Sequence, residues 1–363
     1  MTSSSWLHPE IVKNHSLDMR QFMDFQESVL ADGQRVIQVH NSSGLTFTLL
    51  PDRGLDIWSA HYNGMPLTWV APGSPHLPDY GQSWLTQFNG GLLTTCGLMQ
   101  VGPPETDAET GEFRDLHGNF TRLRAQQVYS EPVVWLEDES RWRMRLNATL
   151  LESRLHGEQY RIERSYTLYA GDPAFTVTDR ITNLRDDAMP LMLLYHCNFG
   201  YPMIREKTEL LAASQVYARD DVAARRGETW HSYEGASTKF DEEVFFHHVN
   251  AGSGLTTRAA LLNEDVGVEL FWNSADLPYL TQWKNTRQGM YVCGVEPGNC
   301  IPEGINSARD AGRLRMIKPG ETQTFSLTLR MLDNPVVLDD SRTEIGKLVK
   351  YGIPVQGCKL DDF

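Results

Sequence analysis

The stretch Arg141-Trp142-Arg143-Met144-Arg145-Leu146-Asn147-Ala148 alternates charged or polar residues with apolar ones. Because successive side chains of a β-strand point to opposite faces, this alternation predicts a strand with one buried face. The same period of two returns in three later segments, residues 160–168, 175–182 and 325–331. Repeated strands of this kind, without helical repeats between them, favour an all-β fold of mostly antiparallel sheet with few short helices.

Strong turn sequences, such as Gly171-Asp172-Pro173 and Lys318-Pro319-Gly320-Glu321, separate these strands, and no low-complexity linker divides the chain. A single β domain can be longer than the average domain. We therefore expect one domain over residues 1–363, with residues 1–33 as an N-terminal extension and residues 334–363 as a C-terminal segment that holds a short helix.

Outside the strands, helix signals are few and two long polar segments stand out. A helix is predicted over residues 341–350, where Ser341 and Glu344 could form a capping box. Residues 102–115 and 217–241 are polar and charged, which is typical of exposed loops. Long loops in compact β proteins are often functional, so we expect both of them to form part of a rim or lid.

The composition excludes several classes of partner. A formal net charge of −14 argues against nucleic acid and against anionic membrane surfaces. No apolar stretch reaches the roughly 20 residues of a membrane span. The start of the chain, Met1-Thr2-Ser3-Ser4-Ser5-Trp6, lacks the basic and apolar regions of a signal peptide, which indicates a cytoplasmic protein.

The cysteines and the one histidine pair do not predict a metal site. The cysteines are odd in number and widely spaced, which favours buried free thiols: Cys96, Cys197, Cys293, Cys300 and Cys358. His247 and His248 are adjacent in a predicted strand and would point to opposite faces, so we do not expect them to share an ion. No metal is therefore predicted.

Glu296 is the strongest candidate for a general base. It ends the apolar run Tyr291-Val292-Cys293-Gly294-Val295 and precedes the turn Pro297-Gly298. A carboxylate in that position is held by a rigid strand, is partly desolvated and is open on one side. These properties suit a group that removes a proton.

Two histidines could complete an acid–base set with Glu296. His117 follows the long loop in Leu116-His117-Gly118, and His196 emerges at the end of the apolar run that begins at Met189. Imidazoles titrate near neutral pH and can donate or accept protons, although each histidine could equally be a structural residue. Two imidazoles and a carboxylate on separate strands could move protons in both directions.

Arg53 lies in Pro51-Asp52-Arg53-Gly54, just before a predicted strand. Its rigid fork of donors could grip ligand hydroxyls in a pocket. It could instead pair with Asp52 or Asp56 as a structural arginine, and the sequence leaves both interpretations open.

Two further segments could supply ligand contacts. Asp241, Glu242 and Glu243 precede an apolar strand, and one of them could accept hydrogen bonds from a ligand. Trp283 leads into the Glu296 strand, where it could stack on a ligand ring or pack in the core.

The order and spacing of these residues resemble the galactose mutarotase-like (aldose 1-epimerase) superfamily, in the form of a divergent bacterial branch. The resemblance extends from about residue 36 to residue 331 and rests on Arg53, His117, His196, Glu242 and Glu296. Two positions depart from the family pattern: Tyr195 replaces the usual asparagine before the acid histidine, and Glu242 stands where the family has an aspartate, with Asp241 as its rival. The resemblance implies a large antiparallel sandwich with a sugar on its concave face.

The resemblance also implies an isomerase that interconverts sugar anomers. Glu296 would remove the proton from the O1 hydroxyl, and His196 would protonate the ring oxygen, without a metal or an organic cofactor. The sugar would be bound by Arg53, His117, Glu242, Trp283, Asn198 and Asn299.

Two other interpretations remain open at this level. The chain could be a non-catalytic carbohydrate-binding or sensing protein, because a fold does not determine a function. It could also be another epimerase, a lyase or a hydrolase that acts on a modified, acidic or phosphorylated sugar. A homodimer is expected only because two-fold dimers are the commonest soluble oligomers.

Overall fold

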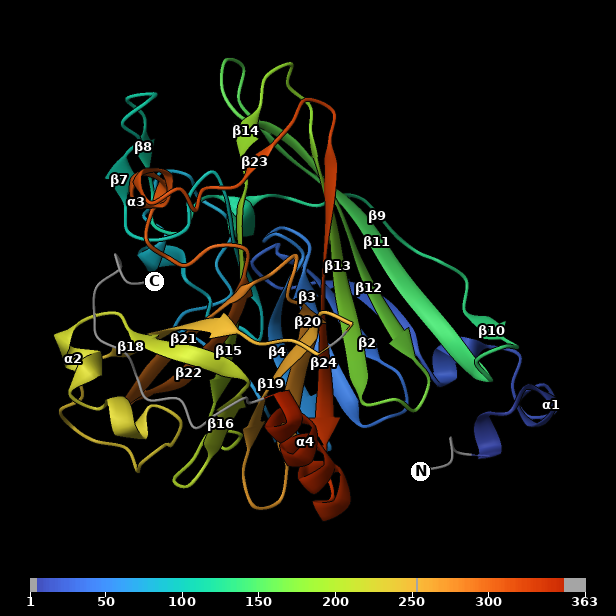
Figure 1. The fold of residues 1–363 in the computed structure, drawn as a ribbon. Helices are drawn as coiled ribbons and strands as arrows, with labels where there is room; N and C mark the ends of the chain where they lie inside the picture. Colours follow the sequence, from blue (N-terminus) through green and yellow to red (C-terminus); the bar gives the residue numbers. More distant parts are fainter. Residues whose placement is uncertain (1–4, 253, 349–363) are drawn as a thin grey trace.

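The computed structural model describes residues 5–252 and 254–348, and antiparallel β-sheets dominate it (Figure 1). Within those residues, three large sheets are accompanied by two sheets of two strands each. The prediction of an all-β antiparallel sandwich is therefore confirmed. In the same part of the chain, no helix is both long enough and apolar enough to cross a membrane.

The largest sheet has nine strands in the described residues, in the order β10-β11-β12-β13-β24-β20-β19-β16, with β9 paired to β11. Its strands are β9 (Gln126–Ser130), β10 (Val134–Leu136), β11 (Arg141–Ser153), β12 (Gln159–Tyr169), β13 (Ala174–Asn183), β16 (Glu209–Ala212), β19 (Thr256–Leu262), β20 (Gly267–Asn273) and β24 (Thr322–Leu332). On β11, Met144, Leu146 and Ala148 are buried while the residues between them are partly exposed, as the alternation predicts.

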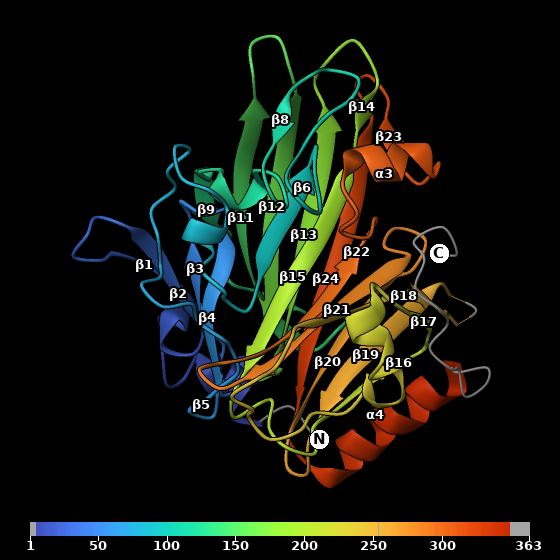
Figure 2. The same cartoon turned by 90° about the vertical axis from the view of Figure 1, so that its left-hand side faces the viewer.

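The second sheet carries the candidate site. In the described part of the chain it has six strands, in the order β17-β18-β21-β22-β15-β6. These are β6 (Thr94–Leu98), β15 (Met192–Gly200), β17 (Ser214–Ala218), β18 (Glu243–Val249), β21 (Tyr279–Arg287) and β22 (Met290–Gly298). β15 is buried along its whole length, because other parts of the protein cover both of its faces. Figure 2 shows β15 and β22 in front of the long strands of the first sheet.

The remaining strands form a meander and two short antiparallel pairs. The meander comprises β1 (Asp24–Val29), β2 (Arg35–His40), β3 (Leu45–Leu50), β4 (Asp56–Tyr62) and β5 (Met65–Pro66). The pairs are β7 (Glu105–Thr106) with β8 (Phe113–Arg114), and β14 (Met189–Pro190) with β23 (Met316–Ile317). Because β1 pairs with β2, part of the segment expected as an N-terminal extension belongs to a sheet.

Helices are short and peripheral. The α-helices are α1 (Pro9–Val12), α2 (Asp221–Ala224), α3 (Ile305–Asp310) and α4 (Pro335–Leu348), and the 3-10 turns are η1 (Ser5–Leu7), η2 (Met19–Gln21), η3 (Leu85–Gln87), η4 (Phe120–Arg122) and η5 (Gly227–Thr229). α4 packs beside β16 and β19 at the foot of the molecule (Figure 2).

The structure corrects the predicted C-terminal helix. α4 begins at Pro335, earlier than residue 341, and residues 349 and 350 lie outside the described residues. The predicted capping box is wrong, because Ser341 lies inside the helix and its hydroxyl donates to Glu269 Oε1 at 3.1 Å. The Ser341 hydroxyl therefore binds a side chain on β20 instead of capping the helix.

The two long polar segments and the cysteines can also be compared with the structure. Residues 217–241 do run between β17 and β18, and they contain α2 and η5. Residues 102–115 hold the β7–β8 pair rather than an irregular loop. Cys96, Cys197, Cys293 and Cys300 are buried free thiols as expected, while Cys358 lies outside the described residues.

A buried arginine ties the three large sheets together. Arg164 on β12 donates to both carboxylate oxygens of Asp179 on β13, at 2.8 and 2.7 Å. It also donates to Asp56 Oδ1 on β4 at 2.8 Å and to Thr95 Oγ1 on β6 at 2.9 Å. The Tyr195 hydroxyl on β15 donates to Asp179 Oδ2 at 2.7 Å. This network fixes the six-stranded sheet against the other two.

Candidate functional site

A cavity of about 830 Å³ opens on the face of the six-stranded sheet. Its base is formed by side chains of β15, β18, β21 and β22, and its walls come from residues 69–88, residues 102–117 and residues 302–303. A volume of this order is typical of small-molecule sites, which measure roughly 300–1,000 Å³.

Glu296 and His196 lie next to each other in this cavity. Cys197 pairs with Val295 across β15 and β22, and this register sets His196 beside Glu296. His196 Nε2 is 3.2 Å from Glu296 Oε1, and the two side chains are 7% and 2% exposed. Glu296 Oε1 has no hydrogen-bond partner among the described residues, so the two groups are close without being bonded to each other.

Burial shifts both members of the pair toward their uncharged forms. It raises the pKa of the Glu296 carboxyl well above its ordinary value, and the negative charge of Glu242 adds to the effect. Burial, followed by the nearby His117, lowers the pKa of His196 to about 3. Burial therefore favours a carboxylic acid at Glu296 beside a neutral imidazole at His196.

Gly294 makes room for the Glu296 carboxylate. It pairs with Trp283 across β21 and β22, two residues before Glu296 on the same face of the strand. A Cβ added at Gly294 would lie 2.1 Å from Glu296 Oε1 and 3.1 Å from the Trp283 Cβ. Any side chain there would have to displace the carboxylate.

His117 lines the same cavity from the wall. Its ring centroid is 5.9 Å from that of His196 in an edge-to-face arrangement, and burial lowers the His117 pKa to about 4. Gly118 follows with φ of +73°, and a Cβ there would lie 2.4 Å from the Gly97 carbonyl oxygen. The His-Gly pair of the sequence is thus explained by close packing of this wall against β6.

Five buried polar atoms of cavity-lining side chains have no hydrogen-bond partner in the described part of the chain: Trp84 Nε1, His117 Nδ1, His196 Nδ1, Thr281 Oγ1 and Glu296 Oε1. Buried polar groups are nearly always paired, and an unpaired one costs about 1–3 kcal/mol. All five atoms belong to side chains that line one cavity.

Aromatic side chains form much of the wall. The rings of Trp84 and Phe88 stack with centroids 4.7 Å apart, and Phe88 lies 5.6 Å from the His196 ring. Trp69 contacts Trp283 edge to face at 6.4 Å. Rings of this kind present flat apolar faces on which the C–H face of a sugar can stack.

Of the two candidate acids, Glu242 is among the residues that line the cavity and Asp241 is not. Its Oε2 accepts from Trp283 Nε1 at 3.0 Å, and its Oε1 accepts from two nitrogens of Arg219 at 3.2 Å. Glu242 therefore orients the Trp283 indole and the Arg219 guanidinium at the rim.

The structure does not bring Arg53 to the cavity. Its guanidinium is buried and donates to three backbone carbonyls, those of Thr121 at 2.8 Å, His76 at 3.0 Å and Gln87 at 3.0 Å. The two carboxylates considered as partners of Arg53 pair with other arginines, Asp52 with Arg35 and Asp56 with Arg164. Arg53 supports the cavity wall from behind.

Asn198 and Asn299 are likewise withdrawn from the cavity. Asn198 Nδ2 donates to the Gly91 and His196 carbonyls at 3.0 and 3.1 Å. Asn299 accepts from the Leu193 amide at 2.7 Å and donates to the Leu191 carbonyl at 2.8 Å. Both side-chain amides bind backbone groups. From the sequence alone, this role cannot be told apart from ligand binding.

Several lining residues escaped the sequence analysis, among them His76, Trp84, Phe88, Arg219 and Thr281. Thr281 pairs directly with Glu296 across β21 and β22, so it could have been found from the register once Glu296 was chosen. The residues on long loops carry no local signal, because only the folded path of the chain brings them to the cavity.

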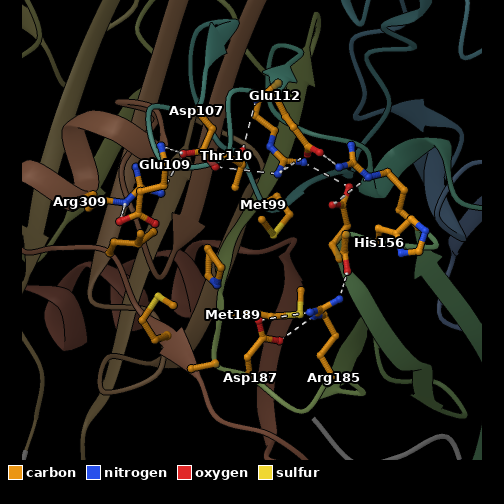
Figure 3. A pocket seen from close by; sticks show the side chains of 18 of the residues that line it. Met99, Asp107, Glu109, Thr110, Glu112, His156, Arg185, Asp187, Met189 and Arg309 are labelled. Carbon is orange, nitrogen blue, oxygen red and sulfur yellow. Dashed lines mark hydrogen bonds and ion pairs between the residues drawn. The ribbon is translucent and has the colours of Figure 1, made fainter.

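A second cavity of about 580 Å³ lies between the β7–β8 pair, the turn after β11 and the α3 region (Figure 3). Carboxylates engage its arginines: Arg309 donates to Asp107 Oδ1 at 3.1 Å, and Arg114 donates to Glu158 Oε1 at 3.2 Å. This network holds β7 and β8 against α3, and the chain then continues from β8 into His117.

Within the described residues, no group of three or more histidine, cysteine, aspartate or glutamate side chains is placed to hold a metal ion. His247 Nδ1 instead forms a hydrogen bond with the Ser214 hydroxyl at 2.8 Å, and His247 is fully buried.

Comparisons with known proteins agree with this fold. Residues 31–331 match a protein family described as "Domain of unknown function (DUF4432)". A solved structure from Klebsiella pneumoniae, provisionally named an aldose 1-epimerase, is 27% identical, has a TM-score of 0.85, and covers 93% of this chain and 90% of its own. A search of curated proteins finds no match.

More distant structures show the same fold at lower identity. A galactose mutarotase-like protein from Clostridium acetobutylicum is 14% identical with a TM-score of 0.60, covering 86% of this chain and 99% of its own. A galactose 1-epimerase from Lactobacillus acidophilus NCFM is also 14% identical, with a TM-score of 0.57 and the same coverage. The architecture is therefore the galactose mutarotase-like sandwich.

Proposed function

We propose that this chain, which belongs to the family described as a domain of unknown function (DUF4432), interconverts the α and β anomers of a reducing sugar. The observation that carries the proposal is the Glu296–His196 pair, 3.2 Å apart at the base of a cavity whose buried polar atoms lack protein partners. The fold neighbours named as epimerases of sugars support the same reaction class.

The proton count of the pair matches the reaction. Opening a pyranose ring removes one proton from the O1 hydroxyl and adds one to the ring oxygen. Transfer of the Glu296 proton to His196 across 3.2 Å gives a carboxylate and an imidazolium, and from this form Glu296 accepts the first proton and His196 supplies the second. The C1–O5 bond breaks, C1 becomes an aldehyde, and the pair ends as carboxylic acid and neutral imidazole. That uncharged form is the one that burial favours.

Ring closure on the other face of the aldehyde reverses these transfers. His196 then removes the proton from the O5 hydroxyl, and Glu296 returns a proton to O1. Before and after each step, Glu296 and His196 together carry one transferable proton. The solvent therefore need not supply or remove a proton. Charge that develops on the sugar oxygens is stabilised by the fixed dipoles of the cavity lining.

The remaining lining residues serve binding in this proposal. His117, Thr281 and Trp84 line the cavity, and their polar groups are the proposed partners of sugar hydroxyls. Trp283, held by Glu242, offers a ring for stacking. No substrate contact is assigned to Arg53, Asn198 or Asn299, because their hydrogen bonds go to the backbone.

Anomer exchange can be measured at equilibrium by proton NMR exchange spectroscopy on a panel of reducing sugars. We expect wild type to accelerate exchange for at least one sugar, and Glu296→Gln to reduce that rate by at least about 100-fold. Glu152→Gln is a matched control, because Glu152 is buried outside the cavity lining and burial raises its pKa to about 8, so an amide replaces a neutral acid.

The outcomes separate the proposal from its main rival. Equal exchange with wild type and Glu296→Gln across the whole panel would contradict the enzyme. If calorimetry then still detected binding of a sugar, the protein would be a carbohydrate-binding or sensing protein instead.

A further inference from the structure

The cavity is larger than a single sugar ring. Its volume is about 830 Å³, whereas a hexopyranose fills roughly 200 Å³, about the volume of six or seven water molecules. Small-molecule sites enclose most of the surface of the ligand that they bind. A substrate that fills this cavity therefore consists of more than one sugar ring or carries a large substituent.

The base of the cavity is narrow, because aromatic rings surround His196. The ring centroids of Phe88, Trp283 and His117 lie 5.6, 5.7 and 5.9 Å from that of His196. Rings at these distances are in contact, so no part of a ligand fits between His196 and any of the three. Beside the Glu296–His196 pair, the base therefore has room for the edge of one sugar ring and for little else.

The outer part of the cavity is formed by exposed side chains, where the lining opens to solvent. Most of them are apolar: Pro72, Leu85, Pro103 and Met290, with Thr86 and Glu242. Trp69 also lines the cavity, and its ring contacts those of Phe88 and Trp283, with centroids 5.9 and 6.4 Å apart. Apolar and aromatic surfaces of this kind can pack against the C–H face of a second sugar ring.

The proposed reaction determines which edge of the sugar faces the base. Glu296 exchanges a proton with O1 and His196 exchanges one with the ring oxygen, so the C1–O5 bond lies against this pair, whose side chains are 2% and 7% exposed. In a pyranose the C3–C4 bond is opposite to the C1–O5 bond, and C2 and C5 flank the reacting bond. The C3–C4 edge therefore points away from the base, toward the exposed side chains.

We infer that the preferred substrate is a reducing oligosaccharide whose reducing ring carries the next sugar at C3 or C4. The reducing ring occupies the base of the cavity, and the next ring occupies the outer part. The orientation of the reducing ring rests on the proposed function. The volume of the cavity and the crowding around His196 do not depend on that function.

A sugar attached at C2 or C6 does not fit in the same way. C2 is bonded to C1, and C6 is bonded to C5 beside the ring oxygen, so either substituent begins next to the Glu296–His196 pair. There it meets the rings of Phe88, Trp283 or His117, which already pack against His196. Contacts of this kind reject a ligand by steric overlap, so the cavity should discriminate between linkage isomers.

The test uses disaccharides of identical composition that differ only in their linkage to the reducing ring: 1,2, 1,3, 1,4 or 1,6. Both the gluco and the galacto series are measured, together with the parent hexoses. We expect kcat/KM for anomer exchange to be about 10-fold higher for a 1,3- or 1,4-linked disaccharide than for the hexose, because the second ring adds binding energy remote from the reacting bond. The 1,2- and 1,6-linked isomers should be at least about 10-fold poorer than the hexose.

A truncation in the outer part of the cavity tests where the second ring lies. Leu85, which is 69% exposed, lines the cavity, and Leu85→Ala removes apolar surface from it. This change should lower the ratio of kcat/KM for the preferred disaccharide to that for the hexose by about 5-fold. Val336→Ala shortens a similarly exposed side chain on α4 and should leave the ratio unchanged. An unchanged ratio in Leu85→Ala would contradict the placement of the second ring.

The same measurements separate this inference from the proposed function. Exchange that is fastest for the hexose, or for a 1,2- or 1,6-linked disaccharide, would overturn the substrate class and support the mutarotase. Absence of catalysed exchange for every sugar would overturn the mutarotase, and with it the orientation on which the substrate class rests. Exchange that is fastest for a 1,3- or 1,4-linked disaccharide would support both.

Discussion

Tyr195 and His196 are adjacent in β15, yet their side chains point to opposite faces of the six-stranded sheet. The Tyr195 hydroxyl donates to Asp179 in the core at 2.7 Å, and His196 faces Glu296 in the cavity at 3.2 Å. Adjacent residues of one strand therefore contribute to the core on one face and to the cavity on the other. Tyr195, at the position where the galactose mutarotase-like pattern has an asparagine, adds its hydroxyl to the hydrogen-bond network of Arg164 and Asp179.

We therefore expect two conservative substitutions to affect different properties, one the stability of the fold and the other the rate of anomer exchange. Tyr195→Phe removes one hydrogen bond from Asp179 and should lower the free energy of unfolding by about 1–3 kcal/mol, with little effect on anomer exchange. His196→Asn should reduce exchange by about 100-fold or more with little loss of stability. Denaturant unfolding and NMR exchange measure the two quantities. A kinetic defect in Tyr195→Phe as large as that of His196→Asn would contradict this expectation.

Gly294→Ala should reduce activity without removing any polar group. The new methyl would lie 2.1 Å from Glu296 Oε1, so the carboxylate must leave its position beside His196. Because misplacement by about 1 Å can cost about 100-fold in rate, we expect a loss of that order in kcat. Gly289→Ala is no control for this purpose, since its φ of +82° would add strain of its own. Gly346→Ala, on α4 with open space around it, is the better comparison and should leave kcat unchanged.

The buried ionisable groups predict a stability maximum near pH 6.5. Burial lowers the pKa values of His117, His196 and His247 to about 4, 3 and 3, so the unfolded chain binds more protons as the pH falls below 6.5, and stability falls with it. Glu152, at about 8, and Glu296 act in the opposite sense: the folded chain keeps their protons, and this stability is lost as the pH rises toward 8.

Variants outside the cavity can test each side of that maximum. His247→Gln should reduce the acid-side slope of unfolding free energy against pH by about one proton, or about 1.4 kcal/mol per pH unit. Glu152→Gln should flatten the neutral-to-alkaline side by a similar amount. Denaturant unfolding between pH 4 and pH 9 gives both slopes, and slopes equal to those of wild type would refute the assignment.

Arg53 is predicted to act by holding the cavity wall. Arg53→Lys cannot reproduce three hydrogen bonds to the Thr121, His76 and Gln87 carbonyls. We expect faster hydrogen–deuterium exchange in residues 71–88 and a rise in KM of about 10-fold, with a smaller change in kcat. If Arg53 instead bound the substrate directly, Arg53→Lys would weaken substrate binding while the amides of residues 71–88 stayed protected from exchange.

Much of the fold could be predicted from the sequence because the relevant signals are local. The alternation over residues 141–148 depends only on the chemistry of successive side chains, and it defined β11 correctly. Glu296 and His196 were found because a charged or titratable residue in an apolar run is unusual, and both line the cavity.

The rest depends on contacts between distant segments. The partners of Arg53 are backbone carbonyls 23, 34 and 68 residues away. Because every residue has a backbone carbonyl, the sequence does not show which ones Arg53 binds. The sequence predicts Ser341 as a helix cap because its actual partner, Glu269, lies 72 residues away on strand β20. Trp84 and Phe88 reach the cavity only through the path of a long loop.

The unpartnered polar atoms of the cavity make the melting temperature a detector of the natural ligand. Each such atom weakens the folded state, and a sugar that satisfies several of them binds the folded chain alone. At a concentration 100 times its dissociation constant, such a ligand would add about 2.7 kcal/mol to the stability. A thermal scan across a sugar library can therefore rank candidates before any of them is assayed for turnover.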